Sequence, residues 1–146
     1  MAPVSGALDG VAQLMRQLEE LGLAANGKAL RAAVRAGSRP VVKRAKQLIP
    51  EGADAHRTYR GRLVTPGFAK RSIRTVTKLS RDKQKASVAI GVRAEAFYAT
   101  QFVELGTSRQ APQPWLRPAM EQTQQEQLAA LGDSLKKTIE KAAKKK

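Results

Sequence analysis

Residues 72–92 read SIRTVTKLSRDKQKASVAIGV, and this stretch decides the class of fold. Two runs within it, residues 72–79 and 86–92, are rich in β-branched side chains, which favour strands. In the second run every other residue is Val or Ile, as a half-buried strand requires. The polar segment between the runs, residues 80–85, suits a turn. The stretch therefore predicts a β-hairpin at about residues 72–92.

Two helices are predicted on the N-terminal side of this hairpin. Between residues 8 and 21 apolar side chains recur every three to four positions, which is the spacing of an amphipathic helix. A second helical pattern follows Asn26, a suitable capping residue, and runs towards Ile49. Pro40 interrupts this second pattern because proline has no N–H to donate, so a kink or break is expected near Arg39.

The second helical pattern carries a basic face opposite its apolar face. No acidic residue lies between positions 21 and 50. Like charges four residues apart on a helix are mildly destabilising. The face is therefore either solvated surface or a contact for a polyanion or an acidic partner. As a contact surface, it could line the lumen of a ring or meet DNA. Its members are Lys28, Arg31, Arg35, Arg39, Lys43 and Lys46.

The remaining segments complete an α+β fold. Residues 51–67 hold three glycines and one proline without periodicity, which predicts a mobile loop. Residues 95–105 could form a short helix or a strand, and the proline-rich stretch after them predicts an irregular loop. After Pro118 good helix formers dominate, which predicts one long helix. We thus expect a small antiparallel sheet, made of the 72–92 hairpin and a possible further strand, packed by two N-terminal helices and a long C-terminal helix.

Length and composition indicate one domain and exclude several classes of protein. The chain has 146 residues, so we expect a single domain over residues 1–143 and a basic tail at 144–146. It has no cysteine, which excludes disulfides, thiolate metal sites and thiol nucleophiles. Its one histidine, His56, lies in the loop without clustered carboxylates, so no metal site is expected. We found no catalytic Ser–His–acid pattern or phosphate-binding loop, so we expect neither an enzyme nor a cofactor.

Charge and hydropathy suggest the surroundings in which the protein works. No stretch approaches the roughly 18 consecutive apolar residues that a membrane span needs. We therefore expect a protein that is made and used in water, without a secretion signal and without a membrane partner. The formal net charge is +15, which predicts affinity for polyanions. On charge alone, a small basic architectural protein that binds nucleic acid is one interpretation.

The most specific motifs lie in residues 98–119. They are Tyr98-Ala99, then VELGT at residues 103–107, then PWLRPA at residues 114–119. Two earlier motifs precede them in the chain, namely AKQLIP, which ends the second helical pattern, and GFAKRSI, which leads into the hairpin. In this order and approximate spacing, the motifs resemble the signature of the HK97 gene-product-10-like family of bacteriophage tail-completion or neck proteins. The resemblance covers roughly residues 8–125. It departs from the family at Ala69, where Leu is usual, and in a longer and more basic loop before Gly67.

The resemblance implies a structural virion protein that carries out no reaction. Copies of the chain would form a ring that completes the tail or joins it to the head. Its partners would be itself and other phage neck, connector and tail-tube or terminator proteins, with room for non-specific contact with genomic DNA. Its location would be the tail or neck of the virion, and the host cytoplasm during assembly.

The motif residues are the candidates for contacts between subunits. Glu104 could form a charge-assisted bond to Arg117 or to a neighbouring subunit, or could be a solvated surface glutamate. Gly106 permits a positive φ or a tight turn. Trp115 lies among three prolines that stiffen its loop, so it could fill its own core or anchor a partner. The full set of interface candidates is Tyr98, Phe102, Glu104, Gly106, Thr107, Trp115, Leu116 and Arg117.

Overall fold

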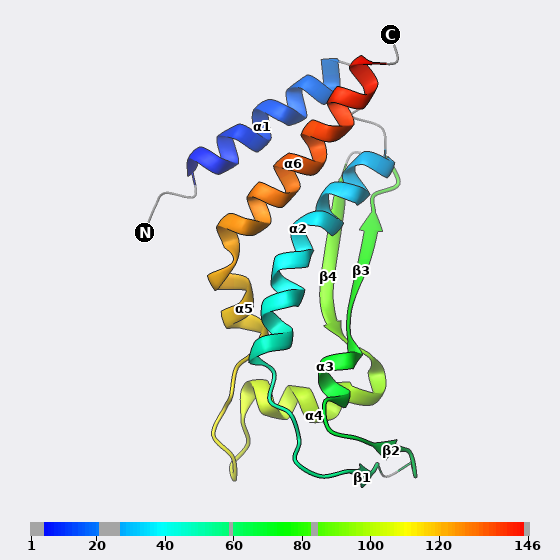
Figure 1. Cartoon of the computed structure of the whole chain (residues 1–146), viewed down its shortest axis with the longest axis vertical. Coiled ribbons are helices and arrows are strands. Elements are labelled where there is room, and N and C mark those ends of the chain that lie inside the picture. Colours follow the sequence, from blue (N-terminus) through cyan, green and yellow to red (C-terminus); the bar gives the residue numbers. More distant parts are fainter. Residues whose placement is uncertain (1–4, 21–26, 59, 83–84, 145–146) are drawn as a thin grey trace. The chain divides into compact units, whose positions relative to one another are not determined.

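The computed structural model describes residues 5–20, 27–58, 60–82 and 85–144. Within these ranges the chain forms six helices and two sheets of two strands each, which confirms the α+β class (Figure 1). The chain divides into two compact units. Unit 1 comprises residues 1–41, 75–89 and 123–146, and unit 2 comprises residues 42–74 and 90–122. Each unit is described by itself.

Unit 1 is built around helices that bury a shared apolar core. Helix α1 (Ser5–Glu20) lies beside α6 (Gln124–Ala143), as Figure 1 shows, and the unit also contains the first part of α2 (Gly27–Leu48) and residues 75–89. The two predicted N-terminal helices are therefore confirmed, although Asn26 lies outside the described residues. Ala33 and Leu135 are fully buried at the centre of the core. Apolar side chains of α1 and α6 pack around them, namely Val11, Leu14, Met15, Leu131 and Ile139.

Helix α2 continues through Pro40, so the break expected near Arg39 does not occur. A proline removes one backbone donor, but packing on either side of it can hold a helix together. Val41 and Ala45, the residues that follow on the apolar face, are completely buried. In the turn before the proline, the Ser38 hydroxyl donates a hydrogen bond of 2.8 Å to the Arg35 carbonyl oxygen. Burial of the apolar face therefore outweighs the missing bond.

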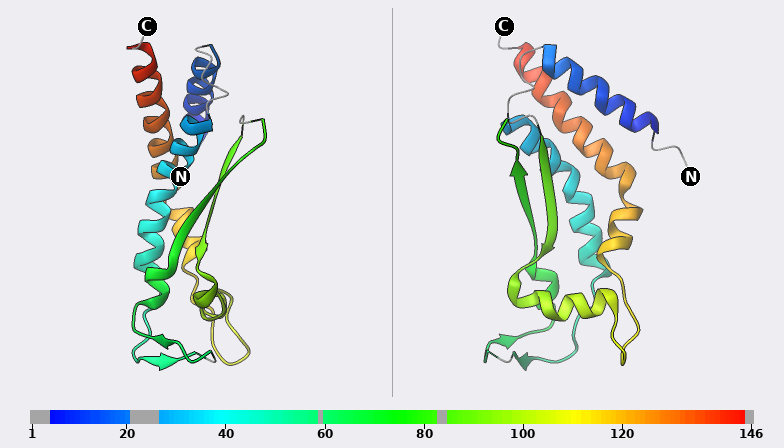
Figure 2. Two further views of the ribbon diagram at one scale, coloured as in Figure 1. Left: turned by 90° about the vertical axis from the view of Figure 1, so that its right-hand side faces the viewer. Right: turned by 180° about the vertical axis from the view of Figure 1, so that it is seen from behind.

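The predicted hairpin is confirmed, and Figure 2 shows it from two sides. Strand β3 (Ile73–Leu79) pairs with β4 (Ala86–Val92), and the Ser80 N–H donates to the Lys85 carbonyl oxygen at 2.8 Å to close the turn. Burial alternates along β3, where odd-numbered residues are covered and even-numbered ones exposed. This is the period of two that the sequence predicts for a sheet with one packed face.

Unit 2 contains the shorter elements. Helix α3 (Phe68–Ser72) packs on α4 (Ala94–Leu105). Residues 95–105, which the sequence allowed to be either a helix or a strand, therefore form a helix. Strands β1 (His56–Arg57) and β2 (Leu63–Val64) form the second sheet within residues 51–67, antiparallel and in the register His56 opposite Val64. The segment expected as a mobile loop thus contains regular structure, while its mobility stays a prediction.

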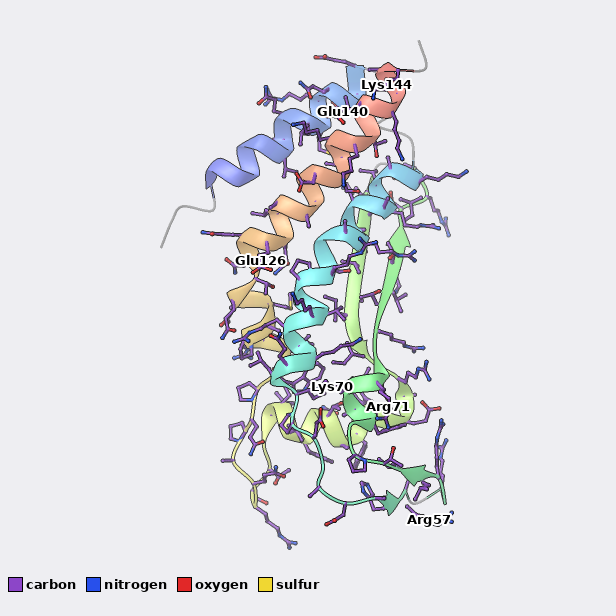
Figure 3. The ribbon with its side chains drawn as sticks, viewed as in Figure 1. Arg57, Lys70, Arg71, Glu126, Glu140 and Lys144 are labelled. Atoms are coloured by element: carbon purple, nitrogen blue, oxygen red, sulfur yellow. The ribbon has the colours of Figure 1, made fainter. Side chains whose placement is uncertain are left out.

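Side chains of α3 hold this segment in place (Figure 3). The Lys70 ammonium group donates to the Glu51 carboxylate at 2.7 Å. The Arg71 guanidinium group donates to the Thr65 hydroxyl at 2.6 Å and to the Pro66 carbonyl oxygen at 3.0 Å. Both cations therefore bind residues that precede their own helix, and they fold the segment back on α3.

The long C-terminal helix is confirmed as α6 (Gln124–Ala143), but a separate short helix precedes it where the sequence predicted one continuous helix. Helix α5 (Leu116–Gln122) begins before Pro118, and α6 follows after Thr123, whose φ of −111° and ψ of 14° depart from helical values. Thr123 is buried, and its hydroxyl accepts a hydrogen bond of 3.1 Å from the Gln127 side chain. Its carbonyl oxygen also accepts from the Gln127 N–H at 2.9 Å. Thr123 therefore starts a new helix instead of continuing the old one.

Candidate subunit interface

Helix α4 in unit 2 exposes a large apolar face. Tyr98 is 72% exposed, Leu105 63%, Phe97 54% and Phe102 39%. At 100° per residue these four side chains lie within an arc of about 140° on the helix. The rings of Tyr98 and Phe102, one turn apart, pack edge to face with centroids 4.8 Å apart. This exposed face carries three aromatic rings and a leucine, with the polar Gln101 between Phe97 and Leu105, and we call it the α4 aromatic face.

The opposite side of α4 is buried. Ala96 and Thr100 lie one turn apart, and both are fully covered. The Thr100 hydroxyl donates to the Ala96 carbonyl oxygen at 2.9 Å, so its polar atom is satisfied inside the helix. Trp115 is 3% exposed, and its indole N–H lies 3.5 Å from the Thr100 carbonyl oxygen. Apolar side chains thus lie on both sides of α4, and within the described part of the chain only one of these sides is covered.

Gly106 ends α4 in a conformation that only glycine adopts readily. Its φ is 75° and its ψ 176°. A Cβ atom at this position would lie 2.8 Å from the Pro112 nitrogen and 3.0 Å from the Gln110 carbonyl oxygen. Both the backbone angles and the close approach of the following loop therefore require glycine here. The tight turn expected at Gly106 is present.

The loop after Gly106 folds back towards α4. The Thr107 N–H donates to the Gln110 carbonyl oxygen at 2.9 Å, and the Thr107 hydroxyl accepts from the Gln110 N–H at 3.1 Å. Farther along, the Gln113 N–H donates to the Val103 carbonyl oxygen at 2.7 Å. These bonds return the chain to the last turn of α4, next to Glu104.

Glu104 caps the N-terminus of α5. Its carboxylate accepts hydrogen bonds from the backbone N–H groups of Trp115 at 2.6 Å, Leu116 at 2.9 Å and Arg117 at 3.1 Å. A helix begins with four N–H groups that have no partner within the helix. Counted from the capping position, Trp115, the fourth of these groups would belong to Pro118, which has no N–H. One carboxylate and one proline thus account for all four groups. The charge-assisted bond expected of Glu104 is made to backbone within its own chain.

The capping interaction also changes the acidity of Glu104. Partial burial raises the pKa of the carboxyl group, but the N–H bonds from Leu116, Trp115 and Arg117 and the positive charge of Arg117 lower it. The lowering effects prevail, so the pKa of Glu104 lies below its ordinary value of 4.5. The carboxylate is therefore charged wherever the protein works near neutral pH.

The structure divides the interface candidates into two groups. Glu104, Gly106, Thr107 and Trp115 hold α4, the loop and α5 together, with Leu116 half-buried and Arg117 exposed beside them. Tyr98 and Phe102 form the α4 aromatic face. Sequence analysis missed Phe97 and Leu105, which extend this face. Leu105 lies three residues after Phe102, and Phe97 is the neighbour of Tyr98, so a helical projection at 100° per residue would have placed both within the same arc once the segment was assigned as a helix.

The six cations of the basic face are all exposed. Four of them lie on the part of α2 within unit 1, and Lys43 and Lys46 lie on the part within unit 2. The opposite side of the helix is buried at Leu30, Ala33 and Val41. The predicted division of α2 into a basic and an apolar face is thus present in the structure.

Among the residues described, none of the helices is both long and apolar enough to cross a membrane. In the same part of the chain, no three His, Asp or Glu side chains gather into a group that could hold a metal ion. His56 lies exposed on β1.

The chain matches one family model. Residues 12–106 match the family described as "Bacteriophage HK97-gp10, putative tail-component". The match ends at Gly106, the residue at which α4 ends. No curated protein and no solved structure matches the chain. Because the family model covers well over half of the chain, this protein belongs to the HK97-gp10-like family of bacteriophage tail components.

Proposed function

We propose that this protein is a ring-forming tail-completion or neck subunit at the head–tail junction of a tailed phage. The observation that carries the proposal is the α4 aromatic face. Four large apolar side chains on one helix are exposed together, and such surfaces in water-exposed proteins mark sites of contact with other proteins. In a family of tail components, the partners to be expected are other subunits of the particle.

Charge supports copies of the same chain as the neighbours on this face. The chain carries a net charge of +15, so two copies repel each other across most of their surfaces. Residues 94–120 are an exception, because two arginines balance two glutamates there. Both glutamates are already engaged: Glu95 forms an ion pair of 2.9 Å with Arg62, and Glu104 caps α5. The α4 aromatic face therefore lies in a neutral segment, so it does not repel the positively charged surface of a neighbouring copy.

The mechanism of such a subunit is geometric. A head-to-tail interface between identical chains closes into a ring when the rotation between neighbours divides a full turn. The two faces of the ring then differ, so one can meet the tail tube or its terminator and the other the connector. This arrangement requires no reaction and no cofactor.

Particles assembled without this protein test the proposed role directly. If the chain joins heads to tails, its absence will leave filled heads and tails as separate structures that electron microscopy can count. A plasmid-borne copy of the gene should restore complete particles. Infectious virions formed in normal number without the protein would contradict the proposal.

The α4 aromatic face can be tested in the purified protein. Replacing Tyr98 and Phe102 together with serine should abolish self-association, because it removes two aromatic contacts from the centre of the face. Sedimentation velocity measures the assembly state, and circular dichroism should report unchanged helix content, since both side chains are exposed. Met120→Ser, which removes an apolar side chain of α5 that is 48% exposed, is the control and should leave assembly intact. Unaltered assembly of the double variant would show that copies meet elsewhere.

A further inference from the structure

A second surface of the protein, on α2, has a different chemistry from the α4 aromatic face. Within unit 1, Arg31, Arg35 and Arg39 lie four residues apart, so the three guanidinium groups follow one another at each turn of the helix. All three side chains are exposed. Among the described residues, none of these three arginines forms a salt bridge. The helix itself has no acidic residue in its first turn or anywhere along its length.

These arginines do not stabilise the fold. Arginines spaced four residues apart repel one another and slightly disfavour the helix. Helix α2 is held instead by its other side, where Leu30 and Ala33 are buried and Gly37 lies so close to α6 that a Cβ atom would be 3.2 Å from the Gln127 carbonyl oxygen. The three positive charges are thus retained at a small cost in stability, which is understandable if they meet an anionic partner.

We propose that this face of α2 binds the phosphate backbone of duplex DNA without sequence preference. Arg31 to Arg39 extend over about 12 Å of helix. Duplex DNA carries one negative charge per about 1.7 Å of its axis, so several phosphates lie within reach of the three arginines at once. The inference does not depend on ring formation, because it concerns a different face of the chain.

The composition of the face favours DNA over an acidic protein. Contacts between proteins draw most of their affinity from a few anchors, mainly Trp, Tyr and Arg, that are packed in desolvated pockets at the centre of the interface. Between the arginines of α2 lie only small side chains on the exposed side, such as Ala32. Contacts to phosphate oxygens need cations alone and carry no sequence information. A face made of arginines without an apolar anchor therefore matches the DNA backbone.

Fluorescence anisotropy with a labelled random-sequence duplex tests the proposal in the full-length protein. The triple variant R31E/R35E/R39E should bind at least tenfold more weakly than the wild type at 0.1 M salt, because three phosphate contacts are lost. The slope of log K against log salt should become shallower by about 3, in keeping with the release of about 0.9 counterions per contact. The matched control is K136E/K137E/K141E on α6, which changes the net charge equally at three exposed lysines. It should weaken binding far less.

Three outcomes would overturn the inference. Equal loss in both variants would show that binding follows total charge and not the α2 face. Absence of wild-type binding at 0.1 M salt would exclude DNA directly. Binding of poly-glutamate, but not of DNA, that is lost in the α2 variant would assign the face to an acidic protein. If circular dichroism shows that R31E/R35E/R39E is unfolded, the pair R31Q/R35Q/R39Q and K136Q/K137Q/K141Q makes the same comparison with smaller changes in charge.

Discussion

Replacing Trp115 with alanine is expected to lower the free energy of unfolding by about 3–5 kcal/mol, which is the usual cost of removing a large buried aromatic side chain. Trp115 is 3% exposed, so the substitution leaves a cavity instead of freeing a surface. Its indole N–H contributes little, since a distance of 3.5 Å to the Thr100 carbonyl oxygen makes a weak bond at best. Urea unfolding followed by tryptophan-independent far-ultraviolet circular dichroism measures the loss.

The matched control for this prediction is Tyr98→Ala. Tyr98 is also aromatic and belongs to the same unit, but it is 72% exposed. Its removal should leave the unfolding midpoint close to that of the wild type, whereas Trp115→Ala should shift it strongly. A Trp115→Ala protein that is as stable as the wild type would show that the indole does not fill the core and would return Trp115 to the candidates for partner contact.

The burial of Trp115 decides between the two roles that the motifs suggested for it, a core residue and an anchor for a partner. In the sequence, the largest apolar side chain on a proline-stiffened loop suits either a core residue or an anchor for a partner. In the structure the loop turns the indole inwards, and the aromatic residues of α4 remain outside. The search for contacts between subunits therefore moves from Trp115 to Tyr98 and Phe102, with Phe97 and Leu105 beside them.

Helices and strands whose apolar side chains recur with a regular period were predictable from the sequence, and those without such a period were not. The hairpin at residues 72–92 and the helices α1 and α2 each bury one face and expose the other, so the pattern of their side chains reports the structure. Helix α4 lacks such a pattern because apolar residues point both inwards, as Ala96 does, and outwards, as Tyr98 does. The absence of a hydrophobic period concealed its helical structure, and the outward-facing apolar residues that break the period are the ones that we propose as a contact surface.

The features that depend on distant residues could not be derived from local patterns. The boundary between α5 and α6 lies at Thr123, which is buried by the packing of the fold and bonded to Gln127. Its burial cannot be read from the neighbouring sequence. The partners of Glu104 lie 11 to 13 residues away. They meet the carboxylate only because Gly106 allows the loop to turn back. The sequence indicated that Glu104 and Trp115 belong to one set of motifs, while the nature of their connection required the structure.

Replacing Glu104 with alanine is the second change expected to have a large effect. It removes the acceptor of three backbone N–H groups at the start of α5, and no residue of that first turn can supply another cap. Loss of a helix cap costs about 0.5–2 kcal/mol, and a hydrogen bond to a charged group is worth about 1.5–3 kcal/mol. Because the carboxylate is only partly buried and water can replace some of the bonds, we expect a loss of about 2–4 kcal/mol in urea unfolding.

Two further variants distinguish the effect of losing the helix cap from the effect of losing a negative charge on α4. Glu95→Ala removes the other glutamate of α4, which forms an exposed ion pair with Arg62, and such pairs contribute little. It should unfold close to the wild type. Glu104→Gln keeps the shape of the side chain but places an NH₂ group against backbone donors, so its stability should be intermediate. If Glu95→Ala and Glu104→Ala were equally destabilising, the cap would have no special role.

The stability that Glu104 contributes should depend on pH in a defined direction. Its pKa in the folded protein is lowered below the ordinary value of 4.5, so folding favours the charged form. The contribution is therefore fully present above about pH 5 and is lost as the pH falls through the lowered pKa. The other acids do not affect the comparison, because they are the same in both proteins. They include Glu51, whose pKa is lowered by its hydrogen bond with Lys70, and Glu95, whose pKa is lowered mainly by a hydrogen bond from its own backbone N–H. The difference in unfolding free energy between the wild type and Glu104→Gln should thus shrink between pH 5 and pH 3. A difference that stays constant over this range would mean that the charge of Glu104 is not what holds α5.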